Sequence, residues 1–142
     1  MKRGRKMNSI SKIIVRYAET DRMGIVHHSV YPIWYELART DFIKKIGITY
    51  SQMEEEGVMT PLVELTSHYI RPANYEDELE VKVRVSKLSP ARIIFYYEVY
   101  HQGELINTGM TMHAWTGKNL KPLNLKKAKP ELYQKIEETM EL

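Results

Sequence analysis

The chain of 142 residues contains no cysteine. It therefore forms no disulfide, and cysteine-ligated zinc, iron–sulfur clusters and a cysteine nucleophile are excluded. Dinucleotide-binding and P-loop motifs are also absent, and five scattered histidines give no convincing set of metal ligands. We expect neither a metal nor a cofactor. The available chemistry is that of carboxylate, histidine, serine, threonine and lysine side chains.

The sequence also lacks any apolar run long enough to cross a bilayer, and its basic start has no apolar segment of a secretory signal. We expect a cytoplasmic protein with no integral membrane association. The formal charge is +3, but four cations stand at the start: Lys2, Arg3, Arg5 and Lys6. The remainder is thus close to −1, so no nucleic-acid partner is expected. We predict a basic, flexible arm over residues 1–9 and a single domain over 10–142.

The first half of the chain indicates a strand, a long helix and a short helix. Residues 10–17 are β-prone and end at a turn. Ser29 and Pro32 suit a helix start, and Gly47 supplies its end. Apolar residues recur along this helix at helical spacing: Val30, Ile33, Trp34, Leu37, Ala38, Phe42, Ile43 and Ile46. Ser51 and Glu54 match a capping box, which predicts a second, short helix.

The second half indicates a sheet. Residues 61–70 are β-prone, and residues 78–85 and 93–99 alternate apolar and polar side chains, as half-buried strands do. A further strand is expected over 105–115 and a final helix over 130–141. Short loops predict an antiparallel meander. The order of elements predicts an α+β domain in which one long helix packs on a single face of an antiparallel sheet.

The most informative segment runs from residue 17 to 39. Asp21 lies in a turn just before the expected helix start, and the pair His27 and His28 follows. A carboxylate near unpaired helix N-terminal N–H groups combines a base or nucleophile with donors for an oxyanion. This combination is typical of an acyl-transfer site. Asp21 could instead merely hydrogen-bond its own turn.

This segment resembles that of hotdog-fold thioesterases of the 4-hydroxybenzoyl-CoA thioesterase family, in particular the YbgC-like acyl-CoA branch. The similarity runs from about residue 13 to 123 and is most specific in Tyr17-Ala-Glu-Thr-Asp-Arg-Met-Gly-Ile-Val-His-His, with support from Tyr31, Trp34, Glu36, Ala38, Arg39, Tyr69, Pro72, Ala73, Asp77 and Leu79. The resemblance implies a sheet wrapped around a central helix. It also implies an acyl-CoA substrate, whose coenzyme A is no separate cofactor, and subunits that pair edge to edge with active sites between them. We expect a homodimer or a dimer-of-dimers homotetramer, because pairing removes an exposed sheet edge.

The resemblance implies that Asp21 either attacks the thioester carbonyl or activates a water, and the sequence does not choose between the two. It implies that the backbone N–H of His28 polarises that carbonyl. For the His27 side chain we expect either contact with the substrate or, equally well, packing at an interface as a residue that connects strand and helix. Glu36 is a second candidate carboxylate, although a pair with Arg39 at spacing i, i+3 on the polar side of the helix is the favoured interpretation.

Three further residues are candidates for binding substrate. The resemblance places Thr60 near the acyl pocket, although it is equally well an ordinary strand residue. Lys87 and Arg92 flank a turn and are candidates for the coenzyme phosphates, with solvated turn charges as the alternative. Two other functions use this architecture: an acyl-chain dehydratase or hydratase, and a non-catalytic acyl-binding module. The histidines lie six and seven residues after Asp21, a spacing that argues against the dehydratase.

Overall fold

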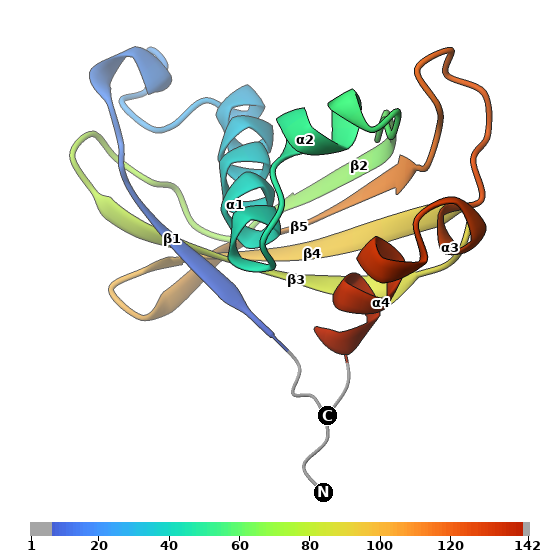
Figure 1. Cartoon of the computed structure of the whole chain (residues 1–142). Coiled ribbons are helices and arrows are strands. Elements are labelled where there is room, and N and C mark those ends of the chain that lie inside the picture. The colour runs from blue at the N-terminus through green and yellow to red at the C-terminus, as the bar shows by residue number, and fades with distance from the viewer. Residues whose placement is uncertain (1–6, 141–142) are drawn as a thin grey trace, which may run out of the picture.

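The computed structural model describes residues 7–140 and contains a five-stranded antiparallel sheet crossed on one face by a long helix, α1 (Figure 1). This confirms the predicted α+β hotdog architecture. The strands are β1 (Ser9–Ile14), β2 (Leu62–Tyr69), β3 (Glu78–Leu88), β4 (Arg92–His101) and β5 (Glu104–Ala114). The helices are α1 (Tyr31–Lys45), α2 (Tyr50–Glu55), α3 (Leu125–Ala128) and α4 (Pro130–Glu138). Among the described residues, no helix is both long and apolar enough to span a membrane.

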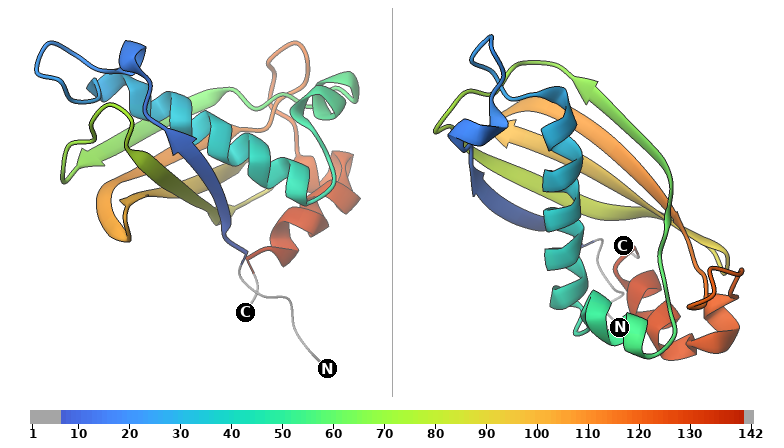
Figure 2. Two further views of the ribbon diagram at one scale, coloured as in Figure 1. Left: turned by 90° about the vertical axis from the view of Figure 1, so that its left-hand side faces the viewer. Right: turned by 90° about the horizontal axis from the view of Figure 1, so that it is seen from above.

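The strand order is β1-β3-β4-β5-β2. Strands β3, β4 and β5 form the predicted meander with short turns, whereas β2 pairs with β5 and β1 pairs with β3. Seen from above, β1 and β2 are the two margins of the sheet, and α1 runs across the strands between them (Figure 2). Both ends of the sheet in the described chain are therefore open edges.

The core lies between α1 and the sheet. The strands β3 and β4 bury every second residue toward the helix, as their alternation predicts. On α1 the buried positions are Tyr31, Trp34, Tyr35, Ala38, Phe42 and Ile43. Ile33 and Leu37, which belong to the predicted apolar stripe, are instead 57% and 44% exposed. The apolar surface of α1 is thus wider than the part that the sheet covers.

Several boundaries differ from the sequence-based expectation. Strand β1 ends at Ile14, and a 3₁₀ turn over Tyr17–Glu19 replaces its expected last residues. The cap of α2 is Thr49, whose hydroxyl accepts from the Gln52 N–H while the Gln52 side chain accepts from the Thr49 N–H. The prediction that Ser51 and Glu54 form this box was wrong, because the same pattern occurs two residues earlier with threonine and glutamine.

The two ends of the described chain meet. The Met7 N–H donates to the Thr139 carbonyl over 2.7 Å, and Ser9 already belongs to β1. Residues 1–6 of the predicted basic arm lie outside the described residues. The final helix, predicted over 130–141, ends at Glu138, and residue 141 lies outside the described residues. The helix α3 was not expected from the sequence; it is a single turn that begins at Asn124, whose side chain accepts from the Lys127 N–H.

A polar layer is buried between α1 and the sheet. The Tyr35 hydroxyl donates to Asn107 Oδ1 and lies 2.8 Å from the Ser67 hydroxyl, while Asn107 Nδ2 donates to the same Ser67 oxygen. The Tyr35 ring stacks on Tyr97 with centroids 4.4 Å apart. Gly109 lies directly beneath this ring, and a Cβ there would come within 3.0 Å of two ring carbons and the hydroxyl oxygen of Tyr35. These contacts fix α1 and β2 to β5.

Candidate active site

The loop that carries Asp21 is a small, tightly hydrogen-bonded turn. The Asp21 backbone N–H donates to the Ile25 carbonyl over 2.8 Å, and the Gly24 N–H donates to the Asp21 carbonyl over 3.0 Å. Gly24 has φ +82°, a conformation that glycine adopts without strain. The Val26 N–H then donates to the Ala73 carbonyl over 2.8 Å, which ties the loop to the segment that precedes β3.

The Asp21 carboxylate is oriented through one oxygen only. Its Oδ1 accepts from the Met23 N–H over 2.8 Å, as in an Asx turn. No hydrogen bond within residues 7–140 involves Oδ2, and the side chain is partly exposed. One oxygen therefore sets the direction of the carboxylate, and the second is available to a water or to a carbonyl carbon.

Glu19 connects this loop to α1. Its buried carboxylate accepts from the Arg16 backbone N–H, the Arg16 guanidinium and the Trp34 indole N–H at 2.8, 3.1 and 3.1 Å. Burial alone would raise the pKa of Glu19, but these hydrogen bonds and the Arg16 charge outweigh it and lower the pKa below its usual value. The Glu19 carbonyl accepts from the His27 N–H over 2.9 Å. Glu19 thus holds the two ends of the Asp21 loop together.

The backbone amides before α1 are paired except at one position. The His27 N–H donates to Glu19, the Ser29 N–H to His27 Nδ1 over 3.2 Å, and the Val30 N–H to the His27 carbonyl over 3.0 Å. For the His28 N–H, the described residues provide no acceptor. Unpaired amides at a helix start carry a partial positive charge. The His28 N–H is therefore the donor that this turn leaves available.

The two histidine side chains stack with ring centroids 4.1 Å apart. His27 Nδ1 accepts from the Ser29 N–H and lies 2.8 Å from the Ser29 hydroxyl. Because Nδ1 is an acceptor, the neutral ring carries its proton on Nε2. The His27 side chain thus caps the helix start, and the exposed His28 ring packs against it.

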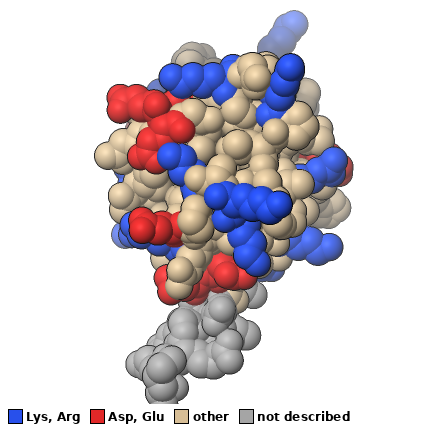
Figure 3. Space-filling model, turned by 45° about the vertical axis from the view of Figure 1, so that its right-hand side comes forward, with Lys and Arg blue, Asp and Glu red and all other residues tan. Residues whose placement is uncertain are grey.

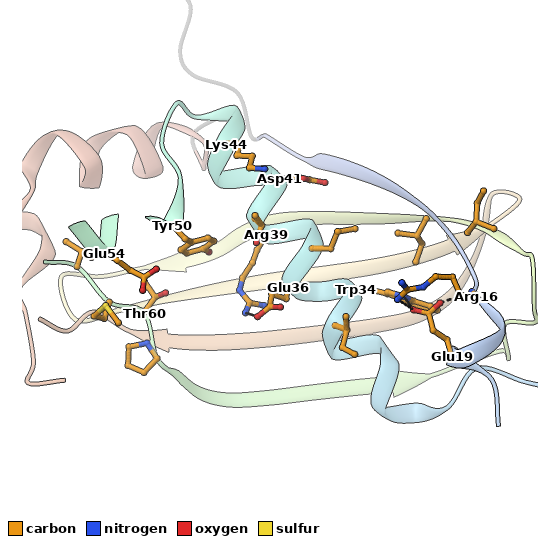
Figure 4. Close-up of a pocket in the computed structure, with 18 of the residues that line it drawn as sticks. Arg16, Glu19, Trp34, Glu36, Arg39, Asp41, Lys44, Tyr50, Glu54 and Thr60 are labelled. Carbon is orange, nitrogen blue, oxygen red and sulfur yellow. Dashed lines mark hydrogen bonds and ion pairs between the residues drawn. The ribbon is translucent and has the colours of Figure 1, made fainter. Parts of the chain in front are cut away.

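A cavity of about 830 Å³ runs along the outer side of α1 (Figure 4). Its apolar walls include the exposed residues Ile33 and Leu37, and Trp34 and Glu19 close one end. Thr60 lines the other end, beside Tyr50 and Glu54. The predicted site residues Asp21, His27, His28, Lys87 and Arg92 do not line it. The structure thus brings Thr60 to the cavity and leaves the Asp21 loop outside its walls.

Arg39 faces this cavity rather than solvent. Its side chain is 14% exposed, and its Nη2 lies 3.8 Å from the Glu36 carboxylate, so the i, i+3 pair forms as predicted. Beneath it runs an ordered set of hydrogen bonds. Arg39 donates to the Tyr97 hydroxyl, which donates to Thr111, which donates to His113 Nε2; His113 Nδ1 then donates to the Thr60 carbonyl. The direction is fixed because a guanidinium only donates and a carbonyl only accepts.

His113 is neutral in this arrangement. Burial, and then the positive charge of Arg39, lower its pKa to about 4. In the neutral ring, Nδ1 carries the proton and donates to the Thr60 carbonyl, and Nε2 accepts from the Thr111 hydroxyl. Of the residues in this hydrogen-bonded chain, only Thr111 is near His113 in sequence. No sequence motif predicts the chain of hydrogen bonds.

Lys87 and Arg92 lie at the turn between β3 and β4, where Arg92 Nη1 contacts Met112 Sδ at 3.3 Å. The Leu125 N–H donates to the Pro90 carbonyl over 2.9 Å, so α3 packs against this turn. The segment 118–138, which contains α3 and α4, is rich in lysine: it carries Lys118, Lys121, Lys126, Lys127, Lys129 and Lys135 against the three acids Glu131, Glu137 and Glu138. Lysine and arginine side chains outnumber acids over much of the face in Figure 3.

Comparisons with known proteins identify the family of this chain. Residues 15–136 match the model of the thioesterase-like superfamily. A putative acyl-CoA thioesterase, YneP of Bacillus subtilis, is 36% identical over 131 residues, which cover 91% of this chain and 95% of that protein. The acyl-CoA thioester hydrolase YbgC of Escherichia coli is 27% identical over 94 residues, which cover 66% of this chain and 70% of YbgC.

Among solved structures, the DHNA-CoA thioesterase of Staphylococcus aureus superposes with a TM-score of 0.85 at 37% identity, covering 92% of this chain and 91% of that one. The match over most of the chain, together with the five-stranded sheet around α1, settles the family. The chain belongs to the thioesterase-like superfamily, has the hotdog fold and is a thioester hydrolase.

Proposed function

We propose that this protein hydrolyses acyl-coenzyme A thioesters, with Asp21 as nucleophile or general base and the His28 N–H as oxyanion donor. The observation that carries the proposal is the pairing of the amides before α1, which leaves the His28 N–H as a donor without an acceptor in the described chain. The relatives named acyl-CoA thioesterases support the choice of substrate. The mechanism needs no metal and no cofactor.

Two routes are consistent with the oriented Asp21 carboxylate. In the first, Oδ2 attacks the thioester carbonyl, the C–S bond breaks, and the coenzyme A thiolate leaves and takes a proton; water then opens the mixed anhydride and regenerates the carboxylate. In the second, Asp21 takes a proton from a water that attacks the same carbonyl. In both, negative charge develops on the carbonyl oxygen, where a fixed amide at a helix start stabilises it.

We further propose that two copies pair through β2, as a homodimer or as half of a dimer-of-dimers tetramer. Strand β2 is an open edge, and its residues Leu62 and Tyr69 are 53% and 47% exposed although they stand opposite the buried residues His113 and Asn107 of β5. An open, apolar edge strand favours pairing with a second strand. Antiparallel pairing about the strand centre sets Leu62 opposite Tyr69 of the partner subunit.

This pairing gives the cavity a place in the reaction. Tyr69 contacts His28, and Leu62 follows Thr60, so the Thr60 end of one cavity faces the Asp21 loop of the other subunit. We therefore assign the cavity to the acyl group. Its volume is in the usual range of small-molecule pockets. The lysine-rich segment and the predicted Lys87 and Arg92 lie toward the same end of the sheet, and there they would neutralise the coenzyme phosphates.

The test is thiol release from short, long and aromatic acyl-CoA thioesters by the wild type, Asp21→Asn and Glu36→Gln. The protein has no cysteine, so it adds no background to a thiol reagent. We expect Asp21→Asn to lose turnover by more than about 10³-fold and Glu36→Gln to keep most of it. Full activity in Asp21→Asn with loss in Glu36→Gln would move the chemistry to Glu36. An inert wild type would favour a non-catalytic acyl-binding module.

A further inference from the structure

The hydroxyl group of Tyr69 reaches from the edge strand β2 to the start of α1. It donates to the backbone carbonyl of His28 over 2.9 Å, across 41 positions of sequence. Its ring also packs edge-on against Tyr31, the first residue of α1, with centroids 5.2 Å apart and planes at 82°. The residue that carries the proposed oxyanion donor is thus held from a second element.

His28 begins a 3₁₀ turn, His28–Val30, that leads into α1, and its carbonyl lacks the donor that a continuous α-helix would supply. In an α-helix, a carbonyl accepts from the N–H four residues later. Four residues after His28 stands Pro32, which has no N–H. Proline suits the first turn of α1, but it leaves the His28 carbonyl without its α-helical donor. The Tyr69 hydroxyl supplies a donor at that place.

The end of β2 that carries Tyr69 is itself firmly fixed. Tyr69 pairs with Asn107 of β5, and the Asn107 side chain, which is fully buried, bonds to Ser67 and to Tyr35 of α1. Groups that orient a site are most effective when their own conformation is locked by packing and hydrogen bonds. The Tyr69 hydroxyl therefore approaches His28 from a rigid frame.

We propose that Tyr69 is a positioning residue that holds the backbone of His28 so that its N–H points at the developing oxyanion. The inference rests on the proposed thioesterase function and extends it to a residue outside the Asp21 loop. The His28 N–H lies in one peptide plane with the His27 carbonyl, which accepts from the Val30 N–H. Tyr69 holds the next plane at the His28 carbonyl, so the two hydrogen bonds together limit rotation of the His28 N–H. Tyr69 also lies on the edge that the proposed dimer covers, which connects pairing of the subunits to the oxyanion donor.

The test compares Tyr69→Phe with Tyr75→Phe. Both tyrosines are about half exposed, both rings pack edge-on against another tyrosine, and the Tyr75 hydroxyl bonds to no described residue. Removing an oxyanion donor costs about 10²- to 10³-fold in kcat, so loosening one is expected to cost about tenfold, with KM within about twofold. Tyr75→Phe is expected to match the wild type. A loss of stability alone would not separate kcat from KM in this way.

A second readout needs no turnover. Amide hydrogen exchange and the ¹⁵N–¹H resonance of His28, followed by NMR, are expected to change in Tyr69→Phe and not in Tyr75→Phe. If Asp21→Asn abolishes hydrolysis while Tyr69→Phe keeps kcat within about twofold, the positioning role is wrong and the proposed function stands. If Asp21→Asn stays active, the proposed function fails, and the NMR measurement alone tests the role of Tyr69. An unchanged His28 resonance and exchange rate in Tyr69→Phe would then show that Tyr69 does not position His28.

Discussion

Replacement of Gly109 by alanine tests the packing that fixes α1 on the sheet. The added Cβ would lie within 3.0 Å of Cζ, Cε2 and the hydroxyl oxygen of Tyr35, whereas nonbonded atoms sit about 3.5–4.0 Å apart. The backbone of β5 cannot retreat, because it is paired on both sides, with β4 and β2. The Tyr35 ring must therefore move.

The cost follows from what the ring then loses. Overpacking a core costs about 1–3 kcal/mol, the stack with Tyr97 contributes about 0.5–1.5, and each hydrogen bond of the hydroxyl about 1. The sum predicts that the free energy of unfolding falls by about 4 kcal/mol. This is a large part of the 5–15 kcal/mol typical of a domain.

The assay is urea unfolding at fixed protein concentration, followed by the fluorescence of the buried Trp34 and Trp115. Gly117→Ala is the matched control. Its Cβ would meet a movable Asn119 side chain at 3.3 Å and the Gly57 carbonyl oxygen at an ordinary 4.0 Å, so the substitution is expected to cost less than about 1 kcal/mol. In a Tyr35→Ala background, Gly109→Ala should cost little as well. A cost below about 1 kcal/mol in the wild type, or an equal cost in both backgrounds, would refute the reasoning.

Three further predictions concern pH, assembly and the Asp21 loop. The pKa of His113 falls from 6.5 to about 4 on folding, so the unfolded chain binds more protons between these pH values. The free energy of unfolding should therefore drop by up to about 3 kcal/mol as the pH is lowered from 6.5 to 4. A free energy of unfolding that does not change with pH in the wild type, or that changes equally in His113→Gln, contradicts this. Val63→Lys should lower the sedimentation coefficient to that of a monomer, whereas Ile14→Lys on the opposite edge should not; the reverse result would place the interface on β1. Glu19→Gln keeps only one strong acceptor for Arg16 and Trp34. It should lower the free energy of unfolding in urea by about 1–3 kcal/mol and also lower kcat. An unchanged kcat would show that the Asp21 loop does not need the hydrogen bonds of Glu19.

Local patterns predicted most of the fold. Val81 and Val83 alternate with charged residues because one face of β3 is buried, and such burial leaves a period of two in the sequence. Only part of the apolar stripe predicted for α1 packs in the core. Periodicity shows that Ile33 and Leu37 lie on the apolar face of the helix, but not whether the sheet or a cavity lies against them. The cap of α2 was displaced because two overlapping motifs compete locally.

Part of the candidate site could likewise be predicted from the sequence, and part could not. Asp21 and His28 stand in one continuous segment, so their proximity to a helix start was visible in the sequence. Tyr69 and His113 act over 41 and 53 positions, on His28 and Thr60, and no spacing in a single sequence reports such contacts. Both are strand residues, and β-propensity describes their backbone but not the partner that the side chain reaches.

The strand order also has a consequence for how this molecule assembles in time. The hairpins of β3, β4 and β5 join neighbours in sequence, whereas β1 reaches β3 across about seventy residues, as in the pairing of Ser9 with Val83. Short loops close faster than long ones, so we expect the meander to form early and β1 to dock late. The Asp21 loop follows β1 directly. The carboxylate proposed for catalysis is therefore expected to reach its place only after most of the chain has folded, so that a nascent or partly unfolded molecule would not yet hold the proposed site.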